Sequence, residues 1–453
     1  MLARGVGRYS RPRRVESALQ ALARGAHPLG GGTRLLARDE LLGEVVDLSA
    51  LGWDELVAAG EGLRAGAMVR LEELAHSRLV AEHSAGLLGE AARGHSASPL
   101  LRGMASLGGE AVTAAHDSPV YAALLALDAQ AVVCGSGGER SRPLGALARG
   151  ERPGLVRALH LPSAPSGAAL ERLAVLPSAP SLAGVAVALW LDGERVARAR
   201  VAALGLEGPP ARSAAAEQEL EGRTFGEPVA SAAARALARP AGFREDAHAS
   251  AAWRRRVSEP LARRALLAAA SRARSGVPEP PLRPWMEAPL PARPCELPLA
   301  SMLLELKLNG RPLRRVVPAG TTLMELLRSA GMLGVKHGCE TGECGACCVL
   351  VDGRPVASCL SLALAADGRA LETIEGLGEP ARLHPVQRAF VETGAVQCGY
   401  CTPALELCAK ALLEALPQPG EAEVRDALSG CLCRCTGYLK PVQAVLRAAA
   451  EPS

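Results

Sequence analysis

The stretch HGCETGECGACC, residues 337–348, gives the strongest indication of the fold of this chain. Three of its cysteines, Cys339, Cys344 and Cys347, follow the spacing C-x4-C-x2-C. A fourth, Cys359, follows the phrase VLVDGRPVAS. Ligands this close together force the backbone to curl around whatever they hold. Gly338, Gly342 and Gly345 suit such a loop, because glycine reaches positive φ at no steric cost. The pattern predicts that the four thiolates converge on one inorganic centre.

The spacing of these four cysteines is the plant-ferredoxin spacing for a [2Fe–2S] cluster. The alternative is a structural zinc site built from the same thiolates. Zinc sites favour two short C-x2-C pairs over a C-x4-C-x2-C run with one distant ligand. The neighbouring Cys348 is interpreted as a packing thiol, since consecutive residues rarely face the same metal. A [2Fe–2S] cluster is therefore the predicted occupant.

The residues that precede this loop predict a strand, a turn, a second strand and a helix, in that order. MLLELKL (302–308) and RPLRRVVP (311–318) flank Asn309-Gly310, the residue pair preferred in a type I′ hairpin turn. Thr321 or Thr322 then caps a helix over LMELLRSAGML, residues 323–333. This order ahead of a cysteine loop predicts a β-grasp ferredoxin domain.

A second set of four cysteines lies in the C-terminal part of the chain, which reads as helices only from about residue 376. Its members form one C-x2-C pair and one C-x-C pair: Cys398, Cys401, Cys433 and Cys435. Helices are expected on either side of these pairs, over residues 385–395, 403–416, 421–430 and 439–450. On spacing alone zinc stays open for this set, whereas four converging ligands argue against a thiol–disulfide enzyme.

Several phrases around the cysteines resemble the small, iron–sulfur subunit of the molybdenum hydroxylases: HGCETGECGACCVLVDG, TIEGL, LHPVQRAF, QCGYCTP and CLCRCTGY. This is the family of xanthine dehydrogenase, carbon monoxide dehydrogenase and aldehyde oxidoreductase, and the resemblance covers about residues 302–450. It implies a [2Fe–2S] cluster on each set of cysteines. The second cluster would lie nearest the molybdopterin of a partner subunit, which Gln397 would contact. Two positions depart from the family pattern, since Ala404 replaces a glycine and Cys431 stands where asparagine is usual.

A glycine run near the N-terminus is a candidate phosphate-binding loop. It follows Leu29 and comprises Gly30, Gly31, Gly32 and Thr33. The third glycine of a G-x-G-x-x-G fingerprint would fall on Leu35, so this is not a Rossmann motif. A glycine run can still present N–H groups to a pyrophosphate as a backbone nest. Taken alone, the run is more often an ordinary turn.

Other phrases resemble the flavin-binding medium subunit of the same family: ASPLLRGMASLGGE (97–110), LLALDAQAVV (124–133) and ASAAWRRRVSEPLARRAL (249–266). The resemblance covers roughly residues 8–275 and implies FAD, held by the Gly30–Thr33 loop and by a second loop made of Ser106, Leu107, Gly108 and Gly109. Glu110 replaces the asparagine usual after that loop. The aspartate usual further on falls on Pro119, and Asp117 is close enough to take its place. Leu173 stands where lysine is usual.

These features predict an α+β multidomain chain. A two-lobed FAD-binding α+β domain is expected at residues 1–168, with an additional C-terminal lobe of the flavin module at 169–276. A Pro-rich linker follows at 277–300, because its prolines cannot continue a helix or a central strand. The plant-type [2Fe–2S] ferredoxin domain is expected at 301–375 and the all-α four-helix [2Fe–2S] domain at 376–453.

Composition narrows the class and the location. The chain has 453 residues, of which 49% are hydrophobic and 22% charged, a core-forming composition. Its formal charge of +4 comes without a basic stripe and interleaved aromatics, so nucleic acid is not expected as a partner. Eleven of the 13 cysteines lie between Cys339 and Cys435, and no secretory leader is seen, which predicts a reducing cytoplasm. No run is long enough to span a membrane.

The predicted function is that of an electron-transfer subunit with no catalytic residue of its own. Electrons would pass from a large molybdopterin-binding partner through the second cluster and the first cluster to FAD, and then to an acceptor such as NAD or a quinone. The family often forms a dimer of heteromers. Two other classes stay open. One is an independent flavin and iron–sulfur reductase without a molybdenum partner, and the other is a zinc-stabilised binding or assembly protein.

Overall fold

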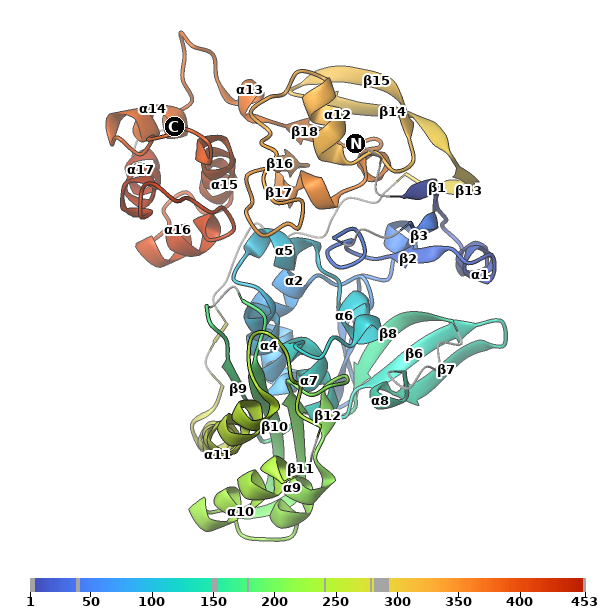
Figure 1. Cartoon of the computed structure of the whole chain (residues 1–453), viewed down its shortest axis with the longest axis vertical. Coiled ribbons are helices and arrows are strands. Elements are labelled where there is room, and N and C mark those ends of the chain that lie inside the picture. Colours follow the sequence, from blue (N-terminus) through green and yellow to red (C-terminus); the bar gives the residue numbers. More distant parts are fainter. Residues whose placement is uncertain are drawn as a thin grey trace. The chain divides into compact units, whose positions relative to one another are not determined.

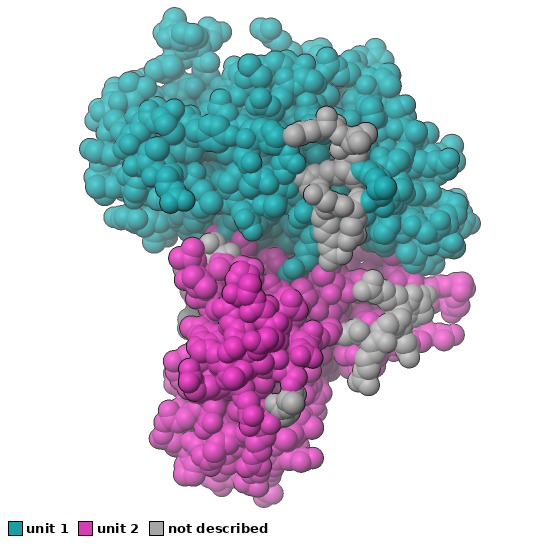
Figure 2. Space-filling view, viewed as in Figure 1, with its two compact units in different colours: residues 1–52, 98–105, 283–453 teal, residues 53–97, 106–282 magenta. Residues whose placement is uncertain are grey.

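The computed structural model describes residues 5–37, 41–147, 154–176, 179–239, 242–277, 279–280 and 293–450. These residues form an α+β chain that folds as two compact units, each built from separate stretches of sequence (Figure 2). Unit 1 comprises Met1–Gly52, Ser98–Ala105 and Arg283–Ser453, and unit 2 comprises Trp53–Ala97 and Ser106–Leu282. None of the described helices is long and apolar enough to cross a membrane.

The N-terminal sheet of unit 1 has the strand order β13-β1-β3-β2. Strand β1 (Val6–Arg11) pairs in parallel with β3 (Gly43–Asp47), which pairs in parallel with β2 (His27–Leu29). Helix α1 (Val15–Ala23) connects β1 to β2, and the short η1 (Leu48–Ala50) follows β3. The connection through a helix is the expected one, because parallel strands need a crossover.

Strand β13 (Cys295–Leu299) is the edge of this sheet and pairs antiparallel with β1. It lies at the end of the segment predicted as a Pro-rich linker, of which residues 278 and 281–292 lie outside the described residues. An edge strand tolerates Pro298, because one side of it needs no ladder hydrogen bonds. The end of the predicted linker is therefore part of a sheet.

Arg11 ties this sheet to two later segments of unit 1, one before and one after the predicted hairpin. Its side chain is 1% exposed and donates to the carbonyl oxygens of Arg293 and Ala365, the latter at 3.1 Å. Next to it, the Tyr9 hydroxyl donates to Asp47 Oδ2 at 2.6 Å. A buried guanidinium needs such acceptors, because an unpaired buried charge is costly.

The second sheet of unit 1 has the order β15-β14-β18-β16-β17. Its strands are β14 (Ser301–Leu308), β15 (Arg311–Pro318), β16 (Cys348–Val351), β17 (Arg354–Ala357) and β18 (Ala370–Glu372). The predicted hairpin is confirmed: β14 and β15 pair antiparallel, and Asn309 and Gly310 both have positive φ, at 50° and 76°. Strands β14 and β18 are parallel, so the sheet is mixed.

Helix α12 (Leu323–Ser329) follows the hairpin. Thr322 caps it and forms a capping box with Glu325, which resolves the choice between Thr321 and Thr322. The predicted extension to residue 333 is wrong, because Gly331 takes φ +89° just after the helix ends. Two 3-10 turns, η2 (Ser358–Leu360) and η3 (Ala363–Ala366), follow β17.

The predicted C-terminal helices are confirmed. They are α14 (Pro385–Glu392), α15 (Thr402–Ala415), α16 (Glu421–Leu428) and α17 (Leu439–Ala449), preceded by the short α13 (Ile374–Leu377). Their apolar faces form one core around Phe390 and Val445, both fully buried. One further helix of unit 1, α5 (Pro99–Met104), comes from the middle of the chain.

The first sheet of unit 2 has the order β4-β5-β8-β6-β7. Its strands are antiparallel and comprise β4 (Leu56–Ala59), β5 (Gly62–Gly66), β6 (Gln130–Gly135), β7 (Gly138–Pro143) and β8 (Leu155–Leu161). The helices that accompany it are α2 (Leu71–His76), α3 (Arg78–Ser84), α4 (Leu87–His95), α6 (Leu107–Thr113), α7 (Pro119–Ala126) and α8 (Leu144–Leu147).

The second sheet of unit 2 is antiparallel, with the order β12-β11-β10-β9. Its strands are β9 (Gly167–Leu173), β10 (Ala183–Asp192), β11 (Arg195–Leu204) and β12 (Ala211–Arg212). Helices α9 (Ala214–Leu220), α10 (Glu227–Ala238) and α11 (Ala251–Ser275) pack beside it (Figure 1). Small alanines and valines on these elements share one buried core.

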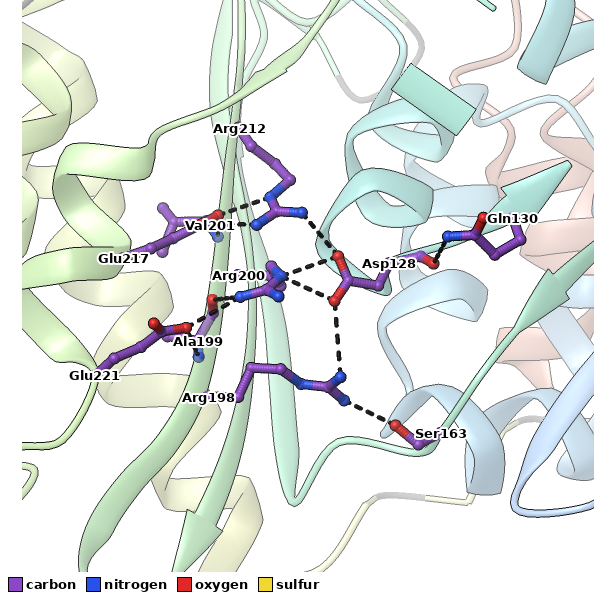
Figure 3. Close-up of polar contacts among 10 residues, drawn as sticks. All are labelled: Asp128, Gln130, Ser163, Arg198, Ala199, Arg200, Val201, Arg212, Glu217 and Glu221. Atoms are coloured by element: carbon purple, nitrogen blue, oxygen red, sulfur yellow. Dashed lines mark hydrogen bonds and ion pairs between the residues drawn. The ribbon is translucent and has the colours of Figure 1, made fainter. Parts of the chain in front are cut away.

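Asp128, just after α7, joins this helix to the second sheet (Figure 3). Its carboxylate accepts from Arg200 Nε at 2.8 Å and from Arg212 Nη1 at 2.8 Å. Arg212 also pairs with Glu217 at 2.7 Å, so charges of both signs are balanced in the network.

Candidate cofactor sites

The first set of cysteines lies on the loop between α12 and β16, with Cys359 in η2. The loop curls as predicted, since Gly342 and Gly345 have φ of +82° and +66°. Gly338 serves a different need, because a Cβ there would lie 2.6 Å from Cys344 Sγ. Glu340 is the non-glycine residue of this loop with positive φ, at 58°.

The thiols of the first set lie in two pairs. Cys344 is hydrogen-bonded to Cys339, and this bond lowers the pKa of Cys339 to about 4. Cys359 is hydrogen-bonded to Cys347, and lowers the pKa of that thiol to about 7. Cysteine binds metal as the thiolate, so a cluster here would take all four of these sulfurs in that form.

The second set lies at two helix junctions. Cys398 and Cys401 precede α15, and Cys433 and Cys435 lie between α16 and α17. They too form pairs, because Cys401 is hydrogen-bonded to Cys433 and Cys398 to Cys435. Burial first, and then the bond to Cys433, raises the pKa of Cys401 to about 12. The Cys398 and Cys435 pair is exposed.

Thr436 and Tyr438 hold the second loop, and sequence reasoning missed both. Thr436 Oγ1 lies 3.1 Å from Cys433 Sγ. The Tyr438 hydroxyl accepts from the Cys433 amide at 2.8 Å and donates to the Cys431 carbonyl at 3.0 Å. They stand in the phrase CRCTGY beside the predicted ligands Cys433 and Cys435, and this proximity is the sequence signal that could have identified them.

Pairs of thiols fit two-iron clusters. In a [2Fe–2S] cluster each iron takes two protein ligands, whereas a structural zinc ion takes four around one centre. Among the described residues, no three His, Cys, Asp or Glu side chains converge in a way suited to a single metal ion. All thirteen cysteines are free thiols.

The two sets are joined inside unit 1. The Leu432 amide donates to the Cys344 carbonyl at 2.8 Å, and the Tyr400 hydroxyl donates to the His337 carbonyl at 2.5 Å. A Cβ on Gly345 would lie 2.0 Å from the Gly430 carbonyl oxygen, so the two loops touch through their backbones.

Three further cysteines fill the space beside these loops. Cys408 Sγ lies 3.7 Å from Cys348 Sγ and 3.6 Å from Cys431 Sγ, and all three side chains are buried. The interpretation of Cys348 as a packing thiol therefore agrees with its surroundings. Cys431, which replaces the usual asparagine, points to Cys408 and to the Gly345 carbonyl.

The predicted phosphate loop Gly30–Thr33 follows β2 in unit 1. Within the described part of the chain, the N–H groups of Gly31, Gly32 and Thr33 have no hydrogen-bond acceptor. A Cβ on Gly31 would lie 2.0 Å from the Met104 carbonyl oxygen, so only glycine fits there. Free amides on a tightly packed glycine run suit an anionic pyrophosphate.

The second predicted loop, Ser106–Gly109, lies in unit 2 and begins α6. Its amides are already used: Leu107 donates to Val69, Gly108 to Ala67, and Gly109 to the Ser106 hydroxyl. A Cβ on Gly108 would lie 2.6 Å from Ala67 Cβ. A ligand at this loop could therefore approach the glycine backbone closely, but it would not find free N–H donors on Leu107, Gly108 or Gly109.

Glu110, which stands where the family usually has asparagine, is accommodated by polar partners. Glu110 is 2% exposed and accepts from the Ser118 hydroxyl at 2.8 Å, with His95 Nδ1 at 3.4 Å. The carboxylate is thus satisfied inside unit 2. Asp117 Oδ1 is buried and has no hydrogen-bond partner among the described residues, which suits a ligand contact. The neighbouring His116 has its pKa lowered, mainly by burial.

Gln397 is exposed beside the exposed thiol of Cys398. It stands at the surface end of the second set, where a group on another chain could reach it. The exposed apolar side chains of Val396, Tyr400 and Leu432 lie on the same loops.

Comparison with known families matches most of the chain. Residues 4–164 match the FAD binding domain in molybdopterin dehydrogenase, and residues 177–269 match the CO dehydrogenase flavoprotein C-terminal domain. Residues 306–373 match the 2Fe-2S iron-sulfur cluster binding domain, and residues 373–446 match the [2Fe-2S] binding domain.

Individual relatives cover the parts separately. The nicotinate dehydrogenase small FeS subunit of Eubacterium barkeri is 47% identical over 149 residues, which are 33% of this chain and 94% of the relative. The xanthine dehydrogenase iron-sulfur-binding subunit of Escherichia coli O157:H7 is 47% identical over 151 residues, 32% of this chain and 93% of the relative. A solved carbon monoxide dehydrogenase chain from Hydrogenophaga pseudoflava superposes with a TM-score of 0.56 at 25% identity, covering 59% of this chain and 98% of that one.

Proposed function

Because this chain belongs to the molybdenum hydroxylase family as a fused FAD-binding and [2Fe–2S] electron-transfer subunit, we propose that it carries electrons from a molybdopterin-binding partner to its flavin. The observation that carries the proposal is the joining of the two cysteine sets. Paired thiols of each set lie in one unit, and the Leu432 amide bonds the carbonyl of the ligand Cys344. Adjacent centres in one compact unit suit a relay.

The proposed ligands are the eight paired cysteines for the two clusters, and Gly30–Thr33, Ser106–Gly109 and Asp117 for FAD. When bound, the clusters would carry single electrons and the flavin would collect them for a two-electron acceptor. The chain's own part is to hold the cofactors at fixed spacing. Free amides of Gly31 and Gly32 would bind pyrophosphate, and the glycine-lined cysteine loops would set the cluster environment.

The proposed domains follow the sequence order. The mixed sheet with α12 supports a β-grasp ferredoxin domain at 301–375, and α14 to α17 support a helical cluster domain at 376–453. The flavin module would take residues 1–168 and 169–276, with the linker at 277–300. In this order the N-terminal sheet takes its edge strand β13 from the end of the linker segment.

The proposed partner is a large molybdopterin-binding subunit that oxidises the substrate. Its docking surface would be the exposed end of the second set, where Gln397 and Cys398 lie among exposed apolar side chains. The acceptor for the flavin would be NAD or a quinone, and the complex would be a dimer of heterodimers. Thirteen free thiols support a reducing cytoplasmic location.

The test is the metal content of the complex captured from its native host by a tag on this chain. Molybdenum in near-equal ratio with this chain, together with a large co-purifying subunit, is the expected result. Iron and flavin without molybdenum would overturn the proposal in favour of an independent reductase. Neither iron nor flavin would favour a zinc-stabilised assembly protein.

A further inference from the structure

One apolar core of unit 1 contains both cluster ligands and the flanks of the glycine loop. Cys347 and Cys359 belong to it, and so do Leu29 and Leu36, which stand on either side of the Gly30–Thr33 loop. All four are buried. The first cluster site and the proposed pyrophosphate loop are therefore packed together without an intervening layer of solvent.

Leu360 touches both the Gly30–Thr33 loop and the cysteine loop at Gly342. Its carbonyl oxygen lies 3.0 Å from the position of a Cβ on Gly32, and its Cδ1 lies 2.4 Å from the position of a Cβ on Gly342. It follows the ligand Cys359 directly and is 1% exposed. The main chain of Leu360 thus meets the Gly30–Thr33 loop (the flavin loop), and its side chain meets the cysteine loop at Gly342 (the cluster loop). Glycine is required at both contacts, at Gly32 and at Gly342.

Helix α5 also contacts both the Gly30–Thr33 loop and the cysteine loop at Gly342. Leu101 Cδ2 lies 2.6 Å from the position of a Cβ on Gly342, and the Met104 carbonyl oxygen lies 2.0 Å from that of a Cβ on Gly31. Leu101 packs on the same apolar core as Leu360. This explains why a six-residue helix from the middle of the flavin region belongs to unit 1.

We propose that Leu360, supported by Leu101, is the positioning residue for electron transfer between the first cluster and the flavin, an inference that rests on the proposed function. The side chain fills the space against the Gly342 loop and keeps water out of it, while the carbonyl of the same residue meets the Gly30–Thr33 loop. Electron tunnelling weakens steeply with distance and with empty space along the path. A densely packed leucine therefore speeds the step, and a cavity in its place slows it.

The step is balanced one electron at a time. Each crossing oxidises the reduced cluster by one electron and adds that electron to the flavin. Two crossings, with two protons from solvent, complete the reduction of the flavin. The reductant is the molybdopterin partner in the proposed complex, and a radiolytically produced reducing radical replaces it in the test.

The experiment compares Leu360→Ala with the native full chain loaded with iron and FAD. A pulse of reducing radicals reduces the protein, and the concentration-independent phase of flavin reduction gives the transfer rate. We expect Leu360→Ala to slow this phase roughly tenfold, given that a misplacement of about 1 Å at a reacting centre can cost about 100-fold. Iron content, FAD content and the EPR signals should match the native chain, and Leu360→Met, which refills the space, should recover most of the rate.

The matched control is Leu371→Ala, which removes an equally buried leucine of the same core on β18. It should keep the native rate. A Leu360→Ala rate equal to that of Leu371→Ala, with both cofactors present, would overturn the inference. If Leu360→Ala does not retain its cofactors, Leu101→Ala at the less buried contact takes its place. A Leu101→Ala rate equal to that of Leu371→Ala, with both cofactors present, would then overturn the inference. Failure of the proposed function looks different, since the native chain would then lack FAD or this kinetic phase.

Discussion

The backbone amide of Leu432 donates a hydrogen bond to the carbonyl oxygen of Cys344 at 2.8 Å. Cys344 belongs to the first cysteine set, and Leu432 directly precedes Cys433 of the second. The path from one ligand to the other therefore consists of covalent bonds and this one hydrogen bond. A Cβ on Gly345 would lie 2.0 Å from the Gly430 carbonyl oxygen, so this close approach of the two loops requires glycine. The two cysteine loops are thus joined through their backbones.

Replacing Cys433 by serine should remove one of two [2Fe–2S] EPR signals and leave the other. The reason is that Cys433 pairs with Cys401, and the first set contains a separate group of four thiols. EPR of the dithionite-reduced chain with iron analysis checks this. Cys431→Ser is the matched control, because its thiol contacts Cys408 and not a ligand. Loss of neither signal in Cys433→Ser would show that the ligands are assigned wrongly.

Replacing Gly31 by valine should lower the FAD content and leave iron unchanged. A side chain at this position would meet the Met104 carbonyl oxygen at 2.0 Å and displace the loop with its free amides. The measurement is the ratio of flavin to iron in the purified chain. Gly103→Ala provides the control, since a Cβ there has open space within 4 Å. A native flavin ratio in Gly31→Val would place the pyrophosphate elsewhere.

Replacing Arg11 by methionine should destabilise unit 1. The change leaves the carbonyls of Arg293 and Ala365 without their buried donor, which costs about 1–3 kcal/mol for each unsatisfied group. Denaturant unfolding followed by loss of cluster absorbance measures the effect. Arg13→Met is the comparison, because Arg13 is exposed and its contact to Glu296 uses the backbone amide. Equal stabilities of the two variants would contradict the role given to Arg11.

Glu406 should make the helical segment less stable as pH rises. Burial raises its pKa from 4.5 to about 7, so between these values the folded chain holds a proton that the unfolded chain releases. Stability therefore falls as pH rises through this window and stays lower above it. Glu406→Gln should remove this pH dependence. Above pH 7 the variant should be more stable than the native chain by about 1.4 kcal/mol for each unit by which burial raises the pKa of Glu406.

Thermal unfolding midpoints measured across this pH window test that expectation. Glu414→Gln, an exposed acid on the same helix, should keep the native slope. If Glu406→Gln shows the same pH dependence as the native chain, the carboxyl titrates at its ordinary value and the burial argument fails.

Local signals in the sequence sufficed for much of the fold. Asn309-Gly310 predicted the hairpin turn because both positions need positive φ, and Thr322 with Glu325 marks a helix start by hydrogen bonds three residues apart. The spacing of the first cysteine set predicted a [2Fe–2S] site, whereas for the second set spacing left zinc open and the family resemblance carried the prediction. The helix after Thr322 was predicted too long because Gly331 acts as a stop, and apolar periodicity alone does not show where a helix ends.

Other features of the sites had no local signal. Leu360 looks like any apolar residue after a ligand, and its role follows from Gly32 and Gly342, which are distant in the chain. The partners of Glu110, which include His95, likewise come from another helix. Such contacts depend on how the whole core packs.

The sequence by itself determined the spacing of the cysteines and the order of local elements, because these depend on residues within a few positions of each other. The tertiary structure alone decided which thiols form pairs and which loops touch. It also decided that α5 and β13 join the unit that holds the clusters. The physical reason is that contacts across long stretches of chain arise from the burial of shared apolar surface and the pairing of strand edges, and no short pattern encodes either of them.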